Sequence, residues 1–259
     1  MTSPKPLRWR VLRGLWRWFG IVAGVTFCAT VSLPTIAITG DGRYGHRLFA
    51  RRWGRFTLRW CGVRLRVEGM EHLDPRRPAV IVANHASHYA FYAIGAALPV
   101  QWRAVIRREM RRIPLFGTLT ERAGHVFIRT GDRSQAVEDI RAGSARLLAG
   151  YWLLVFPEGR PSPEGATLPF RKGAFRVAID AGVPILPVAV DERYRPGDGK
   201  TWDAAPATIV LRILAPLSTE GLGPADAAAL AAGAQVAVES ALQGAAGDGA
   251  AEGDGGRFA

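Results

Sequence analysis

The residues best suited to chemistry stand where an apolar run meets a polar turn. Residues 79–83 read Ala-Val-Ile-Val-Ala, which predicts a buried strand, and Asn84 and His85 follow it directly. A side chain at the end of a buried strand is held rigidly and stays open to a ligand. Because an imidazole with its ordinary pKa, near ~6.5, accepts a proton at neutral pH, His85 is a candidate general base.

A lone histidine is weak evidence, because a histidine bonded inside a loop has the same sequence signature. Three further blocks place polar residues after short apolar runs and favour the chemical interpretation. They read Gly124-His125-Val126-Phe127-Ile128-Arg129-Thr130, Phe156-Pro157-Glu158-Gly159-Arg160-Pro161-Ser162 and Val-Pro-Ile-Leu-Pro-Val over residues 183–188, with Phe170-Arg171-Lys172-Gly173 between the last two.

Taken in this order and spacing, the four blocks resemble those of the glycerolipid acyltransferases typified by 1-acylglycerol-3-phosphate (lysophosphatidic acid) acyltransferase. The resemblance covers about residues 63–217. It implies transfer of a fatty acyl group from acyl-CoA or acyl-carrier protein to the free hydroxyl of a lysophospholipid, above all 1-acylglycerol 3-phosphate, giving phosphatidic acid. It also implies a glycerol-3-phosphate acyltransferase-like α/β fold with a mixed, largely parallel sheet flanked by helices.

Such a reaction needs a base for the hydroxyl proton, which is the role of His85, and cations for the phosphate of the acceptor. A thiolate leaves largely unassisted, so no metal and no other cofactor is expected. The candidate cations are Arg129, Arg160, Arg171 and Lys172. The resemblance extends the substrate-binding set to Asn84, Ser87, Gly124, Glu158, Gly159 and Gly173.

One departure from the family pattern bears on activity. Family members place an aspartate five residues after the histidine, and this chain has Ala90 there. A methyl group cannot accept the imidazole N–H, fix its tautomer or stabilise the imidazolium. Three explanations stay open: a substitution introduced to inactivate the enzyme, a naturally inactive lipid-binding relative, or another carboxylate that reaches His85. Because the other blocks are kept, the first is favoured, and strongly reduced activity is expected.

The arginines of the second and third blocks are displaced by one position. Thr130 and Pro161 stand where family members have arginine, and Arg129 and Arg160 precede them. In a strand, a shift of one residue turns a side chain to the opposite face, so Arg129 reaches a phosphate only if it lies beyond the strand end. The head group of the acceptor therefore stays open.

Other residues of the blocks have a plainer structural interpretation. Phe127 and Ile128 are expected in the core. Glu158 is able to pair with Arg160 or Lys172 at the surface, although its place in the third block favours a role in the site. The remaining histidines are expected to be structural or surface residues: His46, His72, His88 and His125.

The chain is strongly basic and rich in tryptophan. Its net charge is +12, its pI is about 10.8, and eight of its 259 residues are tryptophan. This composition implies an anionic partner and indicates a membrane interface. A nucleic acid is the poorer choice, because the arginines gather beside an uncharged run over residues 18–40. Cys28 and Cys61 predict neither a disulfide framework nor a metal cluster.

Residues 1–60 are expected to anchor the chain to a membrane that carries anionic lipid. As a helix, the run over residues 18–40 is long enough for a hydrocarbon core of ~30 Å. Beyond it, six arginines of residues 43–59 fall on one half of a helix, opposite Phe49, Trp53, Phe56 and Trp60. This pattern favours an amphipathic helix at the bilayer surface over the alternative, an ordinary surface helix packed on the domain. Basic residues flank both ends of the run, so a full span and a bent segment dipping into one leaflet stay open.

A cleaved signal peptide is disfavoured, because strongly basic residues follow the run. The catalytic domain is expected on the cytoplasmic face of the membrane, in a bacterium the inner membrane.

The rest of the pattern alternates strands with helices, which predicts a sheet covered on both faces. It predicts an acyltransferase domain over residues 61–219. Residues 220–259 are rich in alanine and glycine, with one helix near 225–242 and a disordered tail after Gln243. The expected strands cover 63–67, 79–83, 103–106, 124–129, 152–156, 183–188 and 208–214, and the expected helices 89–98, 132–148 and 170–181.

Overall fold

The computed structural model describes residues 7–129, 138–140, 150–161, 167–194 and 205–248. Its sheet has seven strands in the order β1-β7-β6-β2-β5-β3-β4. β7 runs antiparallel to β6 and the other neighbouring pairs are parallel, which confirms the predicted mixed, largely parallel sheet. The strands are β1 (Arg64–Glu68), β2 (Val80–Ala83), β3 (Trp102–Arg107), β4 (Val126–Ile128), β5 (Trp152–Val155), β6 (Ile185–Arg193) and β7 (Thr208–Ile213).

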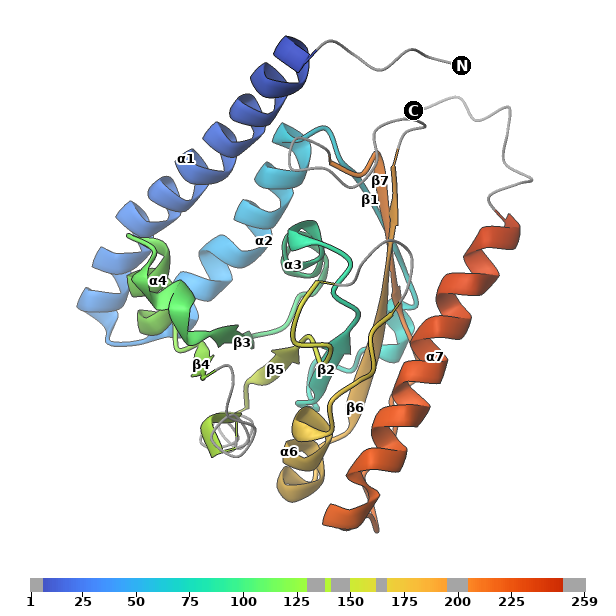
Figure 1. Ribbon diagram of the computed structural model, residues 1–259. Coiled ribbons are helices and arrows are strands. Elements are labelled where there is room, and N and C mark those ends of the chain that lie inside the picture. Colours follow the sequence, from blue (N-terminus) through green and yellow to red (C-terminus); the bar gives the residue numbers. More distant parts are fainter. Residues whose placement is uncertain (1–6, 130–137, 141–149, 162–166, 195–204, 249–259) are drawn as a thin grey trace.

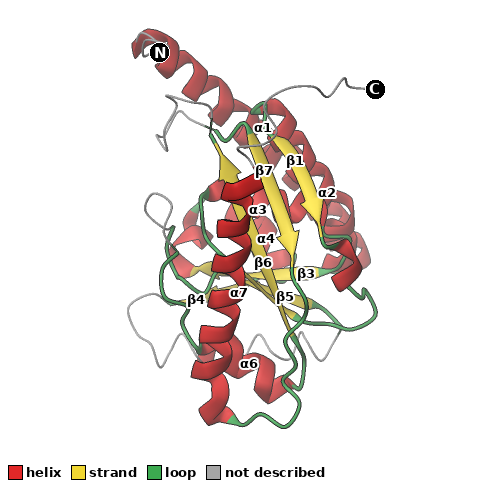
Figure 2. Cartoon of the chain, turned by 90° about the vertical axis from the view of Figure 1, so that its right-hand side faces the viewer, coloured by secondary structure: helices red, strands yellow, loops and turns green. Residues whose placement is uncertain are grey.

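Helices cover both faces of this sheet (Figures 1 and 2). α1, α2, α3 and α4 lie on one side, and α6 and α7 lie on the other. The helices are α1 (Leu7–Thr39), α2 (Gly42–Trp60), α3 (His88–Ala97), α4 (Phe116–Arg122), α6 (Gly173–Ala181) and α7 (Ala227–Asp248), with 3-10 turns at η1 (Met70–His72), η2 (Arg108–Arg112) and η3 (Pro224–Asp226).

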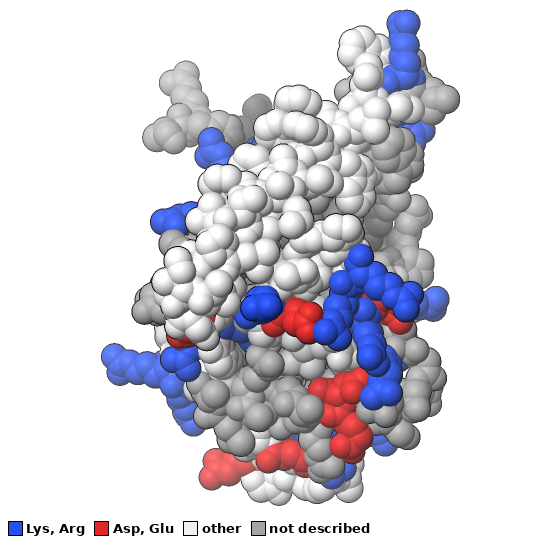
Figure 3. All heavy atoms as spheres, turned by 90° about the vertical axis from the view of Figure 1, so that its left-hand side faces the viewer, with Lys and Arg blue, Asp and Glu red and all other residues white. Residues whose placement is uncertain are grey.

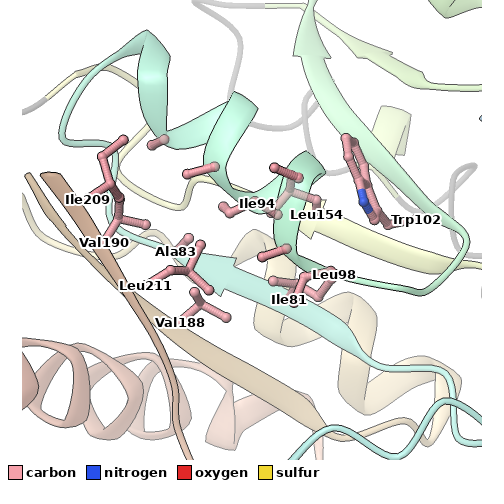
Figure 4. Close-up of a cluster of buried hydrophobic side chains, with 14 of the residues drawn as sticks. Ile81, Ala83, Ile94, Leu98, Trp102, Leu154, Val188, Val190, Ile209 and Leu211 are labelled. Atoms are coloured by element: carbon pink, nitrogen blue, oxygen red, sulfur yellow. The ribbon is translucent and has the colours of Figure 1, made fainter. Parts of the chain in front are cut away.

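The central strand β2 is buried on both faces, and its side chains alternate between two hydrophobic clusters. Ile81 and Ala83 belong to the cluster under α3, whereas Val80 and Val82 belong to the cluster under α6 and α7. Figure 4 shows Ile81 and Ala83 beside Ile94 of α3 and other buried side chains. Because successive strand residues point to opposite faces, four apolar residues suffice to fill both clusters here. The strand that precedes His85 is therefore rigidly held.

The two N-terminal helices pack against each other and against α3. α1 is one continuous helix through Pro34. Asp41 caps α2, because its Oδ1 accepts the N–H of Arg43 at 2.8 Å. Glycine allows α2 to approach α3 closely: a Cβ added at Gly54 would lie 2.5 Å from the carbonyl oxygen of Tyr92.

The aromatic face of α2 is largely used for packing inside the protein. The ring of Trp60 stacks on Trp16 at 4.4 Å, and its Nε1 donates to the Trp16 carbonyl at 2.9 Å. Trp53 meets Tyr92 edge to face at 5.1 Å. Both tryptophans are thus half buried against α1 and α3, because an apolar helix face indicates burial without indicating what covers it. The exposed apolar row belongs to α1 instead: Trp9, Leu12, Leu15, Trp16, Trp18, Phe19, Val22, Phe27, Val31 and Ile38.

Several elements differ in extent from the sequence-based expectation. β6 continues to Arg193, beyond the expected end at residue 188. α7 continues to Asp248, beyond the expected start of disorder after Gln243, because alanine favours the helix. Of the helix expected over residues 132–148, only 138–140 are among the described residues, and residues 249–259 lie outside them.

Candidate active site

The polar residues of the blocks follow strands that end at one edge of the sheet. β2, β3, β4, β5 and β6 run in the same direction, so their carboxyl ends share an edge, where α/β proteins bind ligands. His85 follows β2, Arg129 follows β4 and Glu158 follows β5. The topology therefore brings the first three blocks to one edge.

Two contacts anchor His85 to the third block. Its backbone N–H donates to Oε1 of Glu158 at 2.9 Å, and its ring stacks on Phe156 with the centroids 4.4 Å apart. Oε2 of the same buried carboxylate accepts the N–H of Leu168 at 3.1 Å. Glu158 thus joins the loop after β2 to the chain after β5, which positions His85.

Asn84 fixes the end of β2 to β6. Its Nδ2 donates to the carbonyl of Val190 at 3.0 Å, and its Oδ1 accepts the Val190 N–H at 2.7 Å. The side chain is buried and bonds to β6 as another strand would. The residue before His85 is therefore locked in the sheet.

Ser87 begins α3 and connects it to two residues that the sequence analysis did not select. Its hydroxyl accepts the N–H of Tyr89 at 3.0 Å and donates to Oε1 of Glu192 at 2.6 Å. Oε2 of Glu192 accepts the hydroxyl of Tyr194 at 3.0 Å. One sequence signal could have identified Glu192: it belongs to the polar residues that end β6, at the same edge of the sheet as His85.

The surroundings of His85 disfavour its protonated form. The pKa of His85 is lowered to about 4, because burial lowers it more than a backbone hydrogen bond to Ser87 raises it, and the neighbouring His88 adds to the lowering. The ring is therefore neutral at pH 7 and able to accept a proton. If the ring accepts a proton, the resulting imidazolium is poorly stabilised by these surroundings. A carboxylate beside the ring would stabilise it.

Ala90 follows the candidate base His85 in the loop and first turn after β2. It is fully buried in the first turn of α3, where its N–H donates to the Ser87 carbonyl at 3.2 Å. Its methyl group belongs to the hydrophobic cluster between α3 and the sheet. This position offers neither a charge nor a hydrogen-bond acceptor side chain.

Arg171, in the segment before α6, lies close to the glycine of the third block. Gly159 has a φ of +74°, and a Cβ added there would lie 3.3 Å from Cζ of Arg171. Glycine thus allows both the turn and the close approach of the guanidinium. Arg160 and Lys172 are exposed, and α6 begins at Gly173 with no side-chain cap from a described residue. Arg171, Lys172 and the first amides of α6 form a basic region beside Glu158 and Gly159.

The second block lies at the same edge, beside another acidic residue. β4 ends at Ile128, so Arg129 stands beyond the strand end, the condition under which it can reach a phosphate. Its N–H donates to Oδ2 of Asp139 at 3.0 Å, and its Nε lies 3.6 Å from the same oxygen. Gly124, with a φ of +88°, ends α4 before β4. Thr130 lies outside the described residues.

His88 lies closer to the site than expected for a structural or surface residue. Its ring stacks on Trp18 of α1 at 5.8 Å and lies 4.2 Å from the ring of Tyr89, and burial lowers its pKa. It therefore connects the His85 loop to α1. The other histidines are structural: His46 packs against Trp102, His72 bonds to the Ile213 carbonyl, and Nδ1 of His125 accepts the N–H of Ala104.

No group of three His, Cys, Asp or Glu side chains among the described residues is arranged to hold a metal ion. Cys28 and Cys61 are buried and form no disulfide.

Comparison with known proteins identifies the family. The family model described as Acyltransferase matches residues 64–191. The mouse 1-acyl-sn-glycerol-3-phosphate acyltransferase alpha is 31% identical over 212 residues, covering 80% of this chain and 73% of the relative. The chain belongs to the acyltransferase family.

Two further comparisons agree with the assignment of this chain to the acyltransferase family. The 1-acyl-sn-glycerol-3-phosphate acyltransferase of Pseudomonas aeruginosa is 32% identical over 190 residues, covering 70% of this chain and 72% of the relative. The crystal structure of the 1-acyl-sn-glycerophosphate (LPA) acyltransferase PlsC from Thermotoga maritima superposes with a TM-score of 0.75 at 22% identity, covering 96% of this chain and 98% of that one. This last likeness shows that the acyltransferase shares the PlsC fold.

Proposed function

We propose that this acyltransferase moves a fatty acyl group from acyl-CoA or acyl-carrier protein to the free hydroxyl of 1-acylglycerol 3-phosphate, giving phosphatidic acid. The observation that carries the proposal is the arrangement of His85, held by the Glu158 carboxylate, beside the basic region of Arg171 and Lys172. The names of the relatives from mouse and Pseudomonas aeruginosa support this acceptor.

In the proposed reaction, neutral His85 takes the proton of the acceptor hydroxyl as that oxygen attacks the thioester carbonyl. The carbon–oxygen ester bond forms, the carbon–sulfur bond breaks, and the thiolate leaves. Arg171, Lys172 and the N-terminal amides of α6 bind the phosphate of the acceptor. Glu158 and Asn84 hold the His85 loop in place and touch no reacting atom.

The acyltransferase is proposed to work on a membrane that carries anionic lipid, with the catalytic domain on the cytoplasmic side. By length and composition, α1 is able to cross a bilayer. One side of α1 packs against α2 and the domain, and the opposite side presents the exposed apolar row. A helix with one free apolar side favours lying along one leaflet over crossing both.

Ala90 favours a second candidate function, that of a lipid-binding relative with impaired catalysis. Burial lowers the pKa of the imidazole to about 4, and the buried methyl group of Ala90 supplies no carboxylate to support it. In serine proteases, replacing the aspartate that supports the catalytic histidine lowers turnover about 10⁴-fold. The proposed activity of this chain is therefore strongly reduced, and lipid binding persists.

Ala90→Asp tests both candidates. It should raise acyl transfer by orders of magnitude and move the acidic limb of the kcat/KM profile upward from about pH 4, because a carboxylate beside His85 stabilises the imidazolium. Transfer of radiolabelled acyl groups onto a panel of lysolipids, resolved by thin-layer chromatography, measures the rate and names the acceptor.

Ala90→Asn is the matched control, since it adds the same volume without a charge and should not restore the rate. His85→Ala should change little in the chain as it stands and should abolish the gain in the Ala90→Asp background. Full activity of the unaltered chain, with no gain from Ala90→Asp, would show that the histidine is supported in another way.

A further inference from the structure

The segment from the last residue of β3 to the start of α4 exposes large apolar side chains. This segment, residues 107–115, is named here the arginine loop and includes the 3-10 turn η2. The exposed fractions are 37% for Met110, 43% for Ile113 and 41% for Leu115. Single exposed apolar residues are ordinary, but three within six residues indicate a surface that meets another apolar phase.

The backbone of the arginine loop is strained where it turns Leu115 outward. Leu115 has φ +62° and ψ −50°, and the N–H of Phe116 donates to the Pro114 carbonyl at 2.7 Å. This is a γ-turn of the rare, strained form. Among the described residues, Leu115 is the one non-glycine residue with a positive φ. Strain of this kind persists where the geometry serves a purpose, and here it leaves Leu115 exposed while Phe116 lines an internal cavity.

The charge of the arginine loop favours an anionic partner. Arg107, Arg108, Arg111 and Arg112 are all exposed. Arg111 pairs with Glu121 of α4, and the other three make no ion pair with any described residue. The loop thus carries four arginines and one acidic residue, Glu109, beside exposed apolar side chains, which matches the two layers of an anionic bilayer, the phosphates above and the acyl chains beneath.

The arginine loop lies on the same side of the molecule as the exposed face of α1. α4, which follows it, packs against α1. The outward residues of α1 near this contact, Phe27 and Val31, are 66% and 40% exposed. On the side where α1 lies, Figure 3 shows a broad face without charged side chains, with Lys and Arg gathered below it and some Asp and Glu among them. The opposite helix α7 contains neither Lys nor Arg.

We propose that the arginine loop is a second membrane-contact site, which docks on the phosphates of an anionic bilayer and inserts Ile113 and Leu115 among the lipids. The proposal rests on the membrane association proposed above. It assigns a second point of attachment outside residues 1–60. Because the loop follows β3 at the edge where His85 lies, docking at both α1 and the loop turns this edge towards the bilayer that supplies the lipid acceptor.

The test places an environment-sensitive fluorophore on single exposed cysteines of the full chain. Ile113→Cys reports on the loop, Phe27→Cys on α1, and Val236→Cys, which is 61% exposed on α7, on the far side. Cys28 and Cys61 are buried and react slowly. The probes are vesicles of phosphatidylcholine with phosphatidylglycerol that carry nitroxide-labelled acyl chains. The labels at 113 and 27 should both be quenched, and the label at 236 should not.

Quenching at 27 without quenching at 113 overturns the arginine-loop proposal and leaves the α1 proposal standing. Quenching at neither position overturns both. The charges are tested by Arg108→Gln with Arg112→Gln, which should weaken vesicle binding about 30-fold, since each arginine at the surface contributes about a factor of five. The control removes two exposed arginines elsewhere, Arg76→Gln with Arg77→Gln. If both double variants weaken vesicle binding equally, the effect comes from net charge alone, which contradicts a local site.

Discussion

At the scale of single residues, the hydroxyl of Ser87 holds the loop of His85 to the end of β6. It donates to Glu192, whose other oxygen accepts the hydroxyl of Tyr194. Burial and the charge of Glu192 raise the pKa of Tyr194, so the phenol stays protonated and continues to donate. The position of His85 thus depends on a carboxylate that does not belong to its own loop.

Glu192→Gln should lower kcat by roughly ten- to a hundredfold and leave KM for the acyl donor nearly unchanged. The amide is a weaker acceptor for Ser87, and a small displacement of the base is costly. Kinetics in the Ala90→Asp background measure the split between kcat and KM. Asp191→Asn is the matched control, because Asp191 precedes Glu192 on β6 and pairs with Arg193 of β6 and Arg212 of β7. A loss of stability with kcat unchanged would reduce Glu192 to a structural residue.

The sequence predicted the residues whose block and position both indicated chemistry. His85 and Glu158 were selected because each follows a short apolar strand inside one of the blocks, and their roles stay predictions. Glu192 and His88 were missed. Their roles depend on contacts across the fold, to Ser87 and Trp18, and such contacts leave no periodic pattern in the chain.

At the scale of elements, the close packing of α2 on α3 depends on glycine. A Cβ at Gly54 would lie 2.5 Å from the Tyr92 carbonyl oxygen and 2.8 Å from the Ala96 backbone nitrogen. Both are backbone atoms of α3, so the clash is relieved only if the helices separate.

Gly54→Ala should therefore destabilise the fold by at least about 1–3 kcal/mol, although alanine favours a helix more than glycine does. The free energy of unfolding by denaturant measures the effect. Gly233→Ala in α7 is the control: nothing lies within 4 Å of its added Cβ, and it should stabilise by about 0.5–1 kcal/mol. Equal effects at the two positions would mean that α2 packs on α3 less tightly than described.

Strand and helix type followed from the sequence because β2 and β5 are short apolar runs, and α3 and α6 begin at recognisable turns. The sequence did not predict which elements the two N-terminal helices pack against. The apolar faces of α1 and α2 are both rich in aromatic residues, so the sequence does not distinguish them. The packing in the structure shows that Trp60 is covered by Trp16 and that Phe27 is exposed.

At the scale of the whole molecule, buried histidines connect stability to pH. In the folded chain, burial lowers the pKa of His46, His85 and His88 below the ordinary value. Between about pH 6.5 and the lowered values, the unfolded chain binds protons that the folded chain refuses. Stability is therefore fully present above about pH 6.5 and is lost as the pH falls below it.

The expected loss is up to about 1.4 kcal/mol per pH unit for each of the three histidines. Thermal unfolding in one detergent, between about pH 7.5 and pH 5, measures the slope. His46→Gln removes one neutral buried ring and should reduce the slope by roughly a third. If the His46 variant keeps the full slope, the acid sensitivity originates in other groups.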